Sequence, residues 1–352
     1  MRDSEWSETE GPGRIIAGER RRGRGASSNR SGRYEPVARE AFDDGWETLG
    51  DLAPFRTEVA RERARSIIAT NDSPDLSFDQ SINTYRGCEH GCSYCYARPT
   101  HAYLGHSPGL DFETRLHAKV NAAELLEAEL ARPGYVCKTI ALGAVTDVYQ
   151  PIERDHRLTR SVLEVLARTS HPVGIVTKSA LVMRDIDILA PMAAKGLAKV
   201  AISLTTLDRT VARKMEPRAA TPGRRLDAIR ALSEAGIPVT AMVAPIVPAI
   251  TDSEIEAILA AAAEAGACDA GYVLLRLPLE LKELFREWLA REFPERAQRV
   301  ISVLRSMHGG RDYVSEFGTR QRGTGPYADQ IGMRFRLARQ RLGLGGRDLR
   351  LR

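Results

Sequence analysis

Residues 86–96 read RGCEHGCSYCY, and they set Cys88, Cys92 and Cys95 at Cys-x3-Cys-x2-Cys spacing on a loop after an apolar stretch. Three thiolates can bind three irons of a cubane iron–sulfur cluster and leave the fourth iron without a protein ligand. An iron of this kind is open to a substrate or cofactor. The stretch therefore predicts a reactive metal centre at the end of the first strand.

Two glycines support a cluster on this loop, whereas two histidines allow zinc as an alternative. Gly87 and Gly91 allow the loop backbone to wrap closely around a cluster. A structural zinc site normally has four ligands, and His90 or His101 would supply the fourth. Spacing alone leaves zinc open, and it also leaves open three unrelated buried cysteines.

Apolar, β-rich runs alternate with helical patterns on both sides of the cysteines, which indicates a parallel sheet covered by helices. One helix is well delimited, with Thr221 at its N-cap, Pro222 in its first turn and Gly236 at its end. The six expected strands lie near Ser81–Tyr85, Lys138–Asp147, Pro172–Ser179, Lys199–Thr206, Pro238–Pro248 and Gly271–Pro278.

Polar residues follow most of these strands at their C-terminal ends. An open sheet collects ligand groups at one switch point, whereas a barrel collects them from many strand ends. Six β/α units are too few for a closed eight-stranded barrel. We therefore predict an α/β fold with a partial (β/α)6, TIM-like barrel of parallel strands.

The cysteine motif resembles that of the radical S-adenosylmethionine (SAM) superfamily, since Cys88, Cys92, Tyr94 and Cys95 match its Cys-x3-Cys-x-aromatic-Cys signature. The resemblance implies a 4Fe–4S cluster on the three cysteines and SAM on its open iron. It places Tyr94 against the adenine. It also implies a partial (β/α)6 barrel and reductive cleavage of SAM to a 5′-deoxyadenosyl radical, which takes hydrogen from a substrate.

Further segments are similar to the branch that contains spore photoproduct lyase, over roughly residues 77–291. These segments are TDVYQPIE (146–153), VTKS (176–179), AISLTT (201–206) and EPRAATPGRRLDAI (216–229). The resemblance implies that Thr146 and Asp147 contact the methionine amino group of SAM. Lys178 and Ser203 would contact its carboxylate, and Ala244 would offer backbone to the adenine.

The chemistry of the residues agrees, because an aminocarboxylate needs an acid for its ammonium and a base for its carboxylate. Asp147 and Lys178 supply both groups from neighbouring strand ends. Without the motif, Asp147 would be interpreted as a capping or loop residue and Lys178 as a solvated charge.

The catalytic candidates are Tyr149 and Arg276. In the lyase a cysteine just beyond the second strand returns hydrogen to the product, but residues 142–149 contain no cysteine here, and Tyr149 is the nearby side chain able to replace it. Arg276 could bind a substrate phosphate or carboxylate, or neutralise a buried acid.

Other polar residues near these motifs stay ambiguous. His101 and His106 could face the site or be structural. Glu216, Arg218 and Arg225 could close over SAM or form surface salt bridges.

The chain divides into a largely flexible extension (residues 1–76, tightening near Phe42–Trp46), a core (77–291) and a basic extension (292–352). Residues 296–352 hold thirteen Arg, no Lys and four acidic residues, a net charge of +9 within an overall +5. This Arg-rich segment, with interleaved aromatics, could bind nucleic acid or could be a helical tail packed on the barrel.

Together these features predict a radical SAM enzyme that abstracts hydrogen from an unidentified substrate, with nucleic acid as one candidate. The alternative is a non-catalytic iron–sulfur or zinc protein that binds nucleic acid as a redox or metal sensor. We expect an external electron donor of the flavodoxin or ferredoxin type, a monomer or weak dimer, no membrane association and a cytoplasmic location, since no apolar run reaches the roughly 20 residues of a bilayer span.

Overall fold

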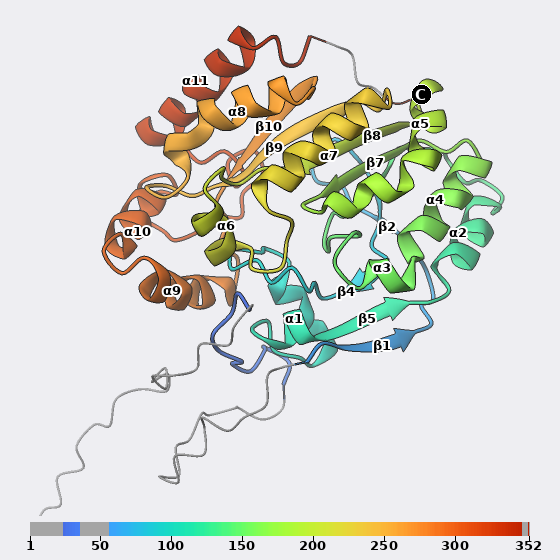
Figure 1. The fold of residues 1–352 in the computed structure, drawn as a ribbon. Coiled ribbons are helices and arrows are strands. Elements are labelled where there is room, and N and C mark those ends of the chain that lie inside the picture. Colours follow the sequence, from blue (N-terminus) through green and yellow to red (C-terminus); the bar gives the residue numbers. More distant parts are fainter. Residues whose placement is uncertain (1–23, 36–55, 347–350, 352) are drawn as a thin grey trace, which may run out of the picture.

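The computed structural model describes residues 24–35, 56–346 and 351, and a curved sheet lies at its centre (Figure 1). The order of the seven strands is β10-β9-β8-β7-β6-β3-β2, and every pair is parallel except β2–β3. The strands are β2 (Ile68–Thr70), β3 (Gln80–Ile82), β6 (Ile140–Leu142), β7 (Val173–Thr177), β8 (Ala198–Ser203), β9 (Val239–Ile246) and β10 (Asp269–Leu274).

Each of the six parallel strands β3 and β6–β10 overlaps one of the six stretches expected from the sequence. The predicted partial barrel is therefore confirmed. Among the described residues β10 and β2 each pair with one strand only, and the barrel is open between them. In β7 the buried Val173 and Ile175 alternate with the more exposed Gly174 and Val176, as expected for a sheet with one face covered by helices.

Helices cover the convex side of this sheet (Figure 1). The predicted helix end points hold for α7, which has Thr221 at its N-cap, Pro222 at its first position and Gly236 with φ +76° just beyond its end. The α-helices of this layer are α2 (Ala122–Leu130), α4 (Leu158–Arg168), α5 (Ile186–Ala194), α7 (Pro222–Glu234) and α8 (Ile255–Glu264). The short helices α3 (Glu153–His156) and α6 (Arg209–Met215) lie in the connections that follow β6 and β8. No described helix combines the length and apolar character that crossing a bilayer requires.

The N-terminal region is more ordered than the sequence predicted. A second sheet has the order β1 (Glu58–Glu62), β5 (Arg115–Lys119), β4 (Tyr85–Arg86), next to α1 (Asp111–Thr114). Residues 24–35 also pack on the core, where the Leu110 N–H donates to the Ser28 carbonyl at 3.2 Å. The expectation of flexibility is therefore wrong for residues 24–35 and 56–76. Residues 1–23 and 36–55, with the expected tightening near Phe42–Trp46, lie outside the described residues.

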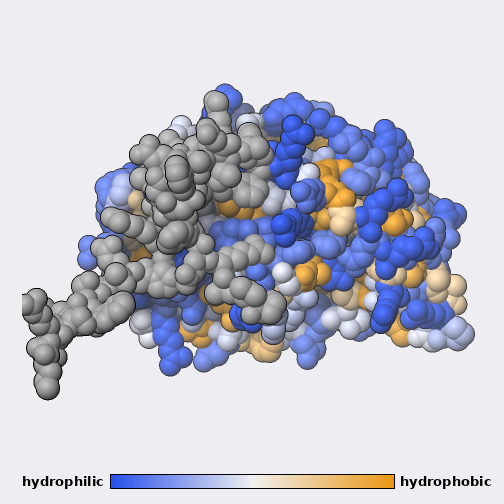
Figure 2. Space-filling model, turned by 90° about the horizontal axis from the view of Figure 1, so that it is seen from below, coloured by the Kyte–Doolittle hydropathy of each residue, from blue (hydrophilic) through white to orange (hydrophobic). Residues whose placement is uncertain are grey.

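The C-terminal region packs on the barrel through α9 (Leu281–Glu292), α10 (Ala297–Ser306) and α11 (Pro326–Arg341). The Phe335 ring of α11 lies 4.7 Å from the Tyr272 ring of β10, between their centroids. We call residues 316–323 the bridging segment. It links the two open edges of the sheet. At the β10 edge, the Leu274 N–H donates to the Gln321 carbonyl at 2.9 Å. Near the β2 edge, Arg320 pairs at 2.5 Å with Asp75, which lies between β2 and β3. From below, the described surface is mostly hydrophilic with scattered apolar residues (Figure 2).

Candidate cluster and SAM site

The loop with the three cysteines (residues 87–96) begins just after β3 and β4. Gly87 and Gly91 have φ of +74° and +66°, a region that favours glycine. Cys88 and Cys92 are each 7% exposed, Cys95 is half-buried, and all three thiols are free. The structure therefore gathers three unpaired thiols on one tight loop at the C-terminal end of the first parallel strand.

The thiols of Cys88 and Cys92 are held in their neutral form when nothing binds them. Burial raises the pKa of Cys92 to about 12, although Lys178 nearby acts in the opposite direction. Burial and the neighbouring Asp147 carboxylate likewise raise the pKa of Cys88. Thiolates are the metal-binding form, so a metal must displace these protons when it binds.

Neither His90 nor His101 is placed as a fourth ligand beside the three cysteines. Within the described ranges, no three His, Cys, Asp or Glu side chains converge as ligands of a single metal ion. His90 lies with Nδ1 3.4 Å from Asp147 Oδ2, and His101 packs edge-on against Phe112 with ring centroids 5.6 Å apart. Both histidines proposed as a fourth zinc ligand thus have other neighbours, whereas three cysteines suffice for a cluster with an open iron.

Asp147 lies at the predicted place after β6, and its carboxylate joins three segments. It accepts hydrogen bonds from Thr177 Oγ1 (2.7 Å), the Lys178 N–H (2.7 Å) and the Tyr149 N–H (2.9 Å), besides its contact with His90. Burial opposes ionisation, but His90 and these donors hold the pKa of Asp147 well below its usual value. This ionised carboxylate therefore also ties β6 to β7 and to the cysteine loop, a role the sequence did not predict.

Lys178 follows β7, and its ammonium lies 5.8 Å from the centroid of the Tyr94 ring. Burial alone would lower the pKa of Lys178, but Cys92 and Glu216 nearby raise it, so the amine is charged at neutral pH. Among the residues that the structure describes, we find no hydrogen bond or ion pair to this ammonium. Lys178 is thus a charged group without an anionic partner beside the cysteine loop.

The other predicted SAM contacts also lie at strand ends. Ser203 is buried at the end of β8, and Ala244 lies in β9, where its carbonyl is 3.4 Å from Thr205 Oγ1. Thr146 is buried, and its hydroxyl donates to the Tyr85 carbonyl at 3.1 Å. The predicted contacts therefore come from the ends of β6, β7 and β8 and from β9.

A buried polar network fixes the aromatic ring of Tyr94. The Tyr94 hydroxyl donates to Glu216, Thr205 Oγ1 donates to the same carboxylate at 2.7 Å, and Arg225 forms an ion pair with it. Burial opposes ionisation of Glu216, but Arg225 and Lys178 lower its pKa below the usual value. Glu216 and Arg225 are therefore interior residues, and the alternative of surface salt bridging is wrong for this pair.

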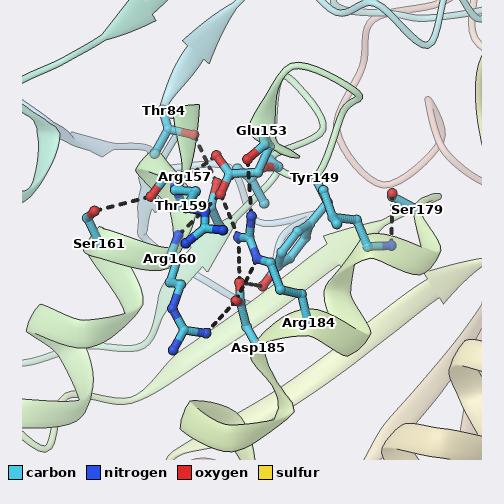
Figure 3. Close-up of polar contacts among 12 residues, drawn as sticks. Thr84, Tyr149, Glu153, Arg157, Thr159, Arg160, Ser161, Ser179, Arg184 and Asp185 are labelled. Carbon is cyan, nitrogen blue, oxygen red and sulfur yellow. Dashed lines mark hydrogen bonds and ion pairs between the residues drawn. The ribbon is translucent and has the colours of Figure 1, made fainter. Parts of the chain in front are cut away.

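The Tyr149 phenol belongs to a buried polar network with Asp185. The Tyr149 side chain is fully buried, and its hydroxyl donates to Asp185 Oδ2 at 3.0 Å (Figure 3). Arg184 pairs with Asp185 and also reaches Glu153 at 2.7 Å in the same network. The backbone N–H of Tyr149 contacts Asp147, but the phenol points into the core, and the expectation that it returns hydrogen is not supported by this geometry.

Arg276 follows β10 and lies close to the cysteine loop. Its guanidinium carbon is 4.8 Å from the centroid of the Tyr96 ring, and Tyr96 directly follows Cys95. The Nε atom of Arg276 is buried and has no hydrogen-bond partner among the described residues. The guanidinium is thus available to an anionic group at this end of the barrel.

The remaining ambiguous residues have structural surroundings. His101 is buried behind the loop, where burial and His106 lower its pKa to about 4, so it is neutral at physiological pH. Arg218 pairs with Glu89 of the cysteine loop at 2.7 Å. His101 and Arg218 therefore each contact the cysteine loop or the segment that packs against it.

The chain is similar to several known proteins over most of its core. The sequence profile of the Radical SAM superfamily matches residues 82–262. An uncharacterized protein of Mycobacterium tuberculosis is 39% identical over 232 residues, 65% of this chain and 68% of that protein. An uncharacterized protein of Methanocaldococcus jannaschii is 27% identical over 247 residues, 70% of this chain and 88% of that protein.

Among solved structures, spore photoproduct lyase complexed with dinucleoside spore photoproduct is similar, with a TM-score of 0.58 and 18% sequence identity. The match covers 81% of this chain and 80% of that one. At this identity the likeness concerns the fold alone.

Proposed function

Because the chain belongs to the Radical SAM superfamily, we propose that Cys88, Cys92 and Cys95 hold its 4Fe–4S cluster and that its strand-end residues hold SAM. When bound and reduced by an external donor, which we take to be of the flavodoxin or ferredoxin type, such a cluster would supply the electron for reductive cleavage of SAM and so for hydrogen abstraction. We also propose a cytoplasmic location, since a reducing compartment keeps such thiols free. Residues 77–291 would form the catalytic core between the two extensions.

The observation that carries this proposal is the unpaired ammonium of Lys178 beside Cys92. Lys178 is half-buried. A partly desolvated cation without an anionic partner is unfavourable, and a ligand carboxylate would complete it. Ser203 would add a hydroxyl at the next strand end. Tyr94, fixed by Glu216, would present its ring to the adenine, and Ala244 would offer backbone there.

The amino group of SAM would lie near Thr146 and Asp147. Because the Asp147 carboxylate already accepts three hydrogen bonds, the ammonium would share it with these donors or displace the weaker His90 contact. Arg276, held over Tyr96, would bind an anionic group of the substrate. Hydrogen would be taken from a substrate anchored at this position.

The first test is anaerobic incubation of the reduced protein with SAM, with and without the dinucleotide spore photoproduct. We expect 5′-deoxyadenosine in both samples but no efficient release of thymine dinucleotide, because residues 142–149 hold no cysteine and the Tyr149 phenol faces Asp185. A reduced, intact cluster that yields no 5′-deoxyadenosine would contradict the proposed activity. Multiple clean turnovers of the photoproduct would contradict the proposal of a different substrate.

Nucleic acid remains our candidate for the substrate class, on the observation of unpaired exposed arginines in the C-terminal region. Much of the positive charge there is neutralised locally, since Arg305, Arg320, Arg334 and Arg339 pair with Asp or Glu residues. The four aromatic residues interleaved with these arginines are Tyr313, Phe317, Tyr327 and Phe335. Three of them pack on the protein or hydrogen-bond to it, and only Phe317 is largely exposed, at 56%. The exposed arginines with no ion pair among the described residues are Arg299, Arg311, Arg322, Arg336 and Arg341.

Point substitutions test this role better than truncation, because α10 and α11 bury Val300, Leu304, Ile331 and Phe335. If the segment contacts phosphates, changing Arg299, Arg311 and Arg336 together to Gln should reduce the slope of log affinity against log salt for single-stranded DNA by about 2. The measurement is a fluorescence titration at several salt concentrations.

The matched control replaces Lys195, Arg132 and Arg154 with Gln, because these exposed charges lie outside this region and likewise form no ion pair among the described residues. Equal slopes for the wild type and both triple variants would exclude a phosphate-contact role for the C-terminal arginines.

A further inference from the structure

A buried ion pair lies directly behind the cysteine loop. Arg98 and Glu113 are both fully buried, with Nη2 and Oε1 2.5 Å apart. Arg98 Nε donates to the Cys92 carbonyl at 2.9 Å, and its Nη1 donates to the Gly109 carbonyl at 2.9 Å. One guanidinium thus joins the backbone of a proposed cluster ligand to the segment that leads into α1. Losing one partner of such a pair strongly destabilises the folded protein, because the other partner becomes a buried charge without a counter-ion.

The same carboxylate also binds the N-terminal segment. Glu113 Oε2 accepts the Gly25 N–H at 3.0 Å, and Oε1 accepts the Ala26 N–H at 2.8 Å. Farther along, Asn29 and Asp111 exchange two hydrogen bonds of 2.9 Å, from Nδ2 to Oδ1 and from the Asp111 N–H to the amide oxygen. Residues 24–29 are therefore fastened to the elements that support the cysteine loop.

The segment also touches the loop itself. A Cβ added to Gly25 would lie 1.7 Å from the Gly91 carbonyl oxygen and 3.3 Å from the Ser93 nitrogen, both between cluster cysteines. A contact this close leaves no room for any residue but glycine at position 25. Thr57, which accepts from Arg24 at 3.1 Å, donates to Glu89 of the loop at 2.6 Å and adds a second attachment.

We propose that residues 24–29, together with Arg98 and Glu113, form a clasp that fixes the cysteine loop and shields its outer side from solvent. The inference rests on the proposed cluster, and it assigns positioning residues that the cysteine motif does not contain. With the clasp in place, the loop backbone behind Cys92 is paired and covered by protein. With the clasp open, the Arg98–Glu113 pair and this backbone face water, and a bound cluster is open to dissolved dioxygen from behind.

The decisive variant is Gly25→Ala, because its methyl group would clash with the Gly91 carbonyl. Hydrogen–deuterium exchange of the metal-free chain, read on a peptide that covers residues 24–29, should be faster by about tenfold or more, since two hydrogen bonds to a charged acceptor are lost. After anaerobic reconstitution, the cluster absorbance should decay in air-saturated buffer faster by about tenfold, if local opening limits access.

Two further variants complete the experiment. Asn29→Ala loosens the clasp at its other end without touching the cysteine loop, and it should change both readouts in the same direction by a smaller factor. Gly223→Ala is the matched control, because a Cβ there meets nothing within 4 Å, and both readouts should stay at the wild-type values.

Each result decides the question. Faster exchange with an unchanged cluster lifetime would overturn the shielding role, and unchanged exchange in Gly25→Ala would overturn the docking itself. A wild-type chain that takes up no cluster would instead contradict the proposed function, whatever the exchange data show.

Discussion

Replacing Cys88, Cys92 or Cys95 with alanine is expected to abolish the iron–sulfur cluster and all cleavage of SAM. A cubane held by only three protein ligands has no spare thiolate to replace a lost one. Since the thiols lie on one short loop, no other described cysteine can reach the vacated position. After anaerobic reconstitution, the iron and sulfide content should fall from about four of each per chain to background.

The two remaining cysteines are the matched controls. Cys268 lies just before β10, with Sγ 3.3 Å from the Val239 carbonyl at the start of β9, and Cys137 is exposed ahead of β6. Both therefore lie at the N-terminal ends of strands, away from the cysteine loop. Cys137→Ala and Cys268→Ala should retain the cluster. Stoichiometric zinc without iron in anaerobically purified wild-type protein would contradict the assignment.

Lys178→Ala is expected to weaken SAM binding by about 10- to 150-fold while leaving the cluster intact, because a charge-assisted contact is typically worth about 1.5–3 kcal/mol. Lys178 is no cluster ligand, and its side chain makes no described ion pair that the substitution would break. Isothermal titration of SAM into the reconstituted, anaerobic protein measures the affinity. An unchanged affinity would show that another group binds the carboxylate.

Asp147→Ala should behave differently from Lys178→Ala. The Asp147 carboxylate binds Thr177 and the Lys178 backbone and lies beside His90 of the cysteine loop, so its loss should lower iron retention as well as SAM affinity. From the sequence alone, Asp147 was expected only to contact the amino group of SAM. The comparison of iron content between the two variants separates these roles.

The partial barrel and the place of the site could be predicted because each depends on a local pattern. The strands are short apolar runs, α7 has Thr, Pro and Gly at its ends, and the cysteines carry their own spacing. Parallel strands bring their C-terminal ends to one side, so Asp147 and Lys178 could be placed near each other without knowledge of the fold.

What could not be predicted depends on contacts between residues far apart in sequence. Residues 24–29 have no periodicity and few apolar side chains, and they are ordered because their backbone donors meet Glu113, a partner almost ninety residues away. Tyr149 was expected near the site from its position in the chain, but its hydroxyl donates to the buried Asp185. The burial of Glu216 and Arg225 likewise follows from packing and not from their sequence neighbourhood.

The bridging segment has a consequence for how the protein behaves in concentrated solution. An open barrel leaves the outer edge of a terminal strand free, and unpaired N–H and C=O groups on such an edge can recruit a strand from another molecule. Gln321 accepts the Leu274 N–H of β10, and Arg320 and Gly318 fasten the same segment to Asp75 near the opposite edge. The segment thereby occupies part of the β10 edge with an irregular backbone that cannot template further pairing, which protects an incomplete barrel against edge-to-edge aggregation.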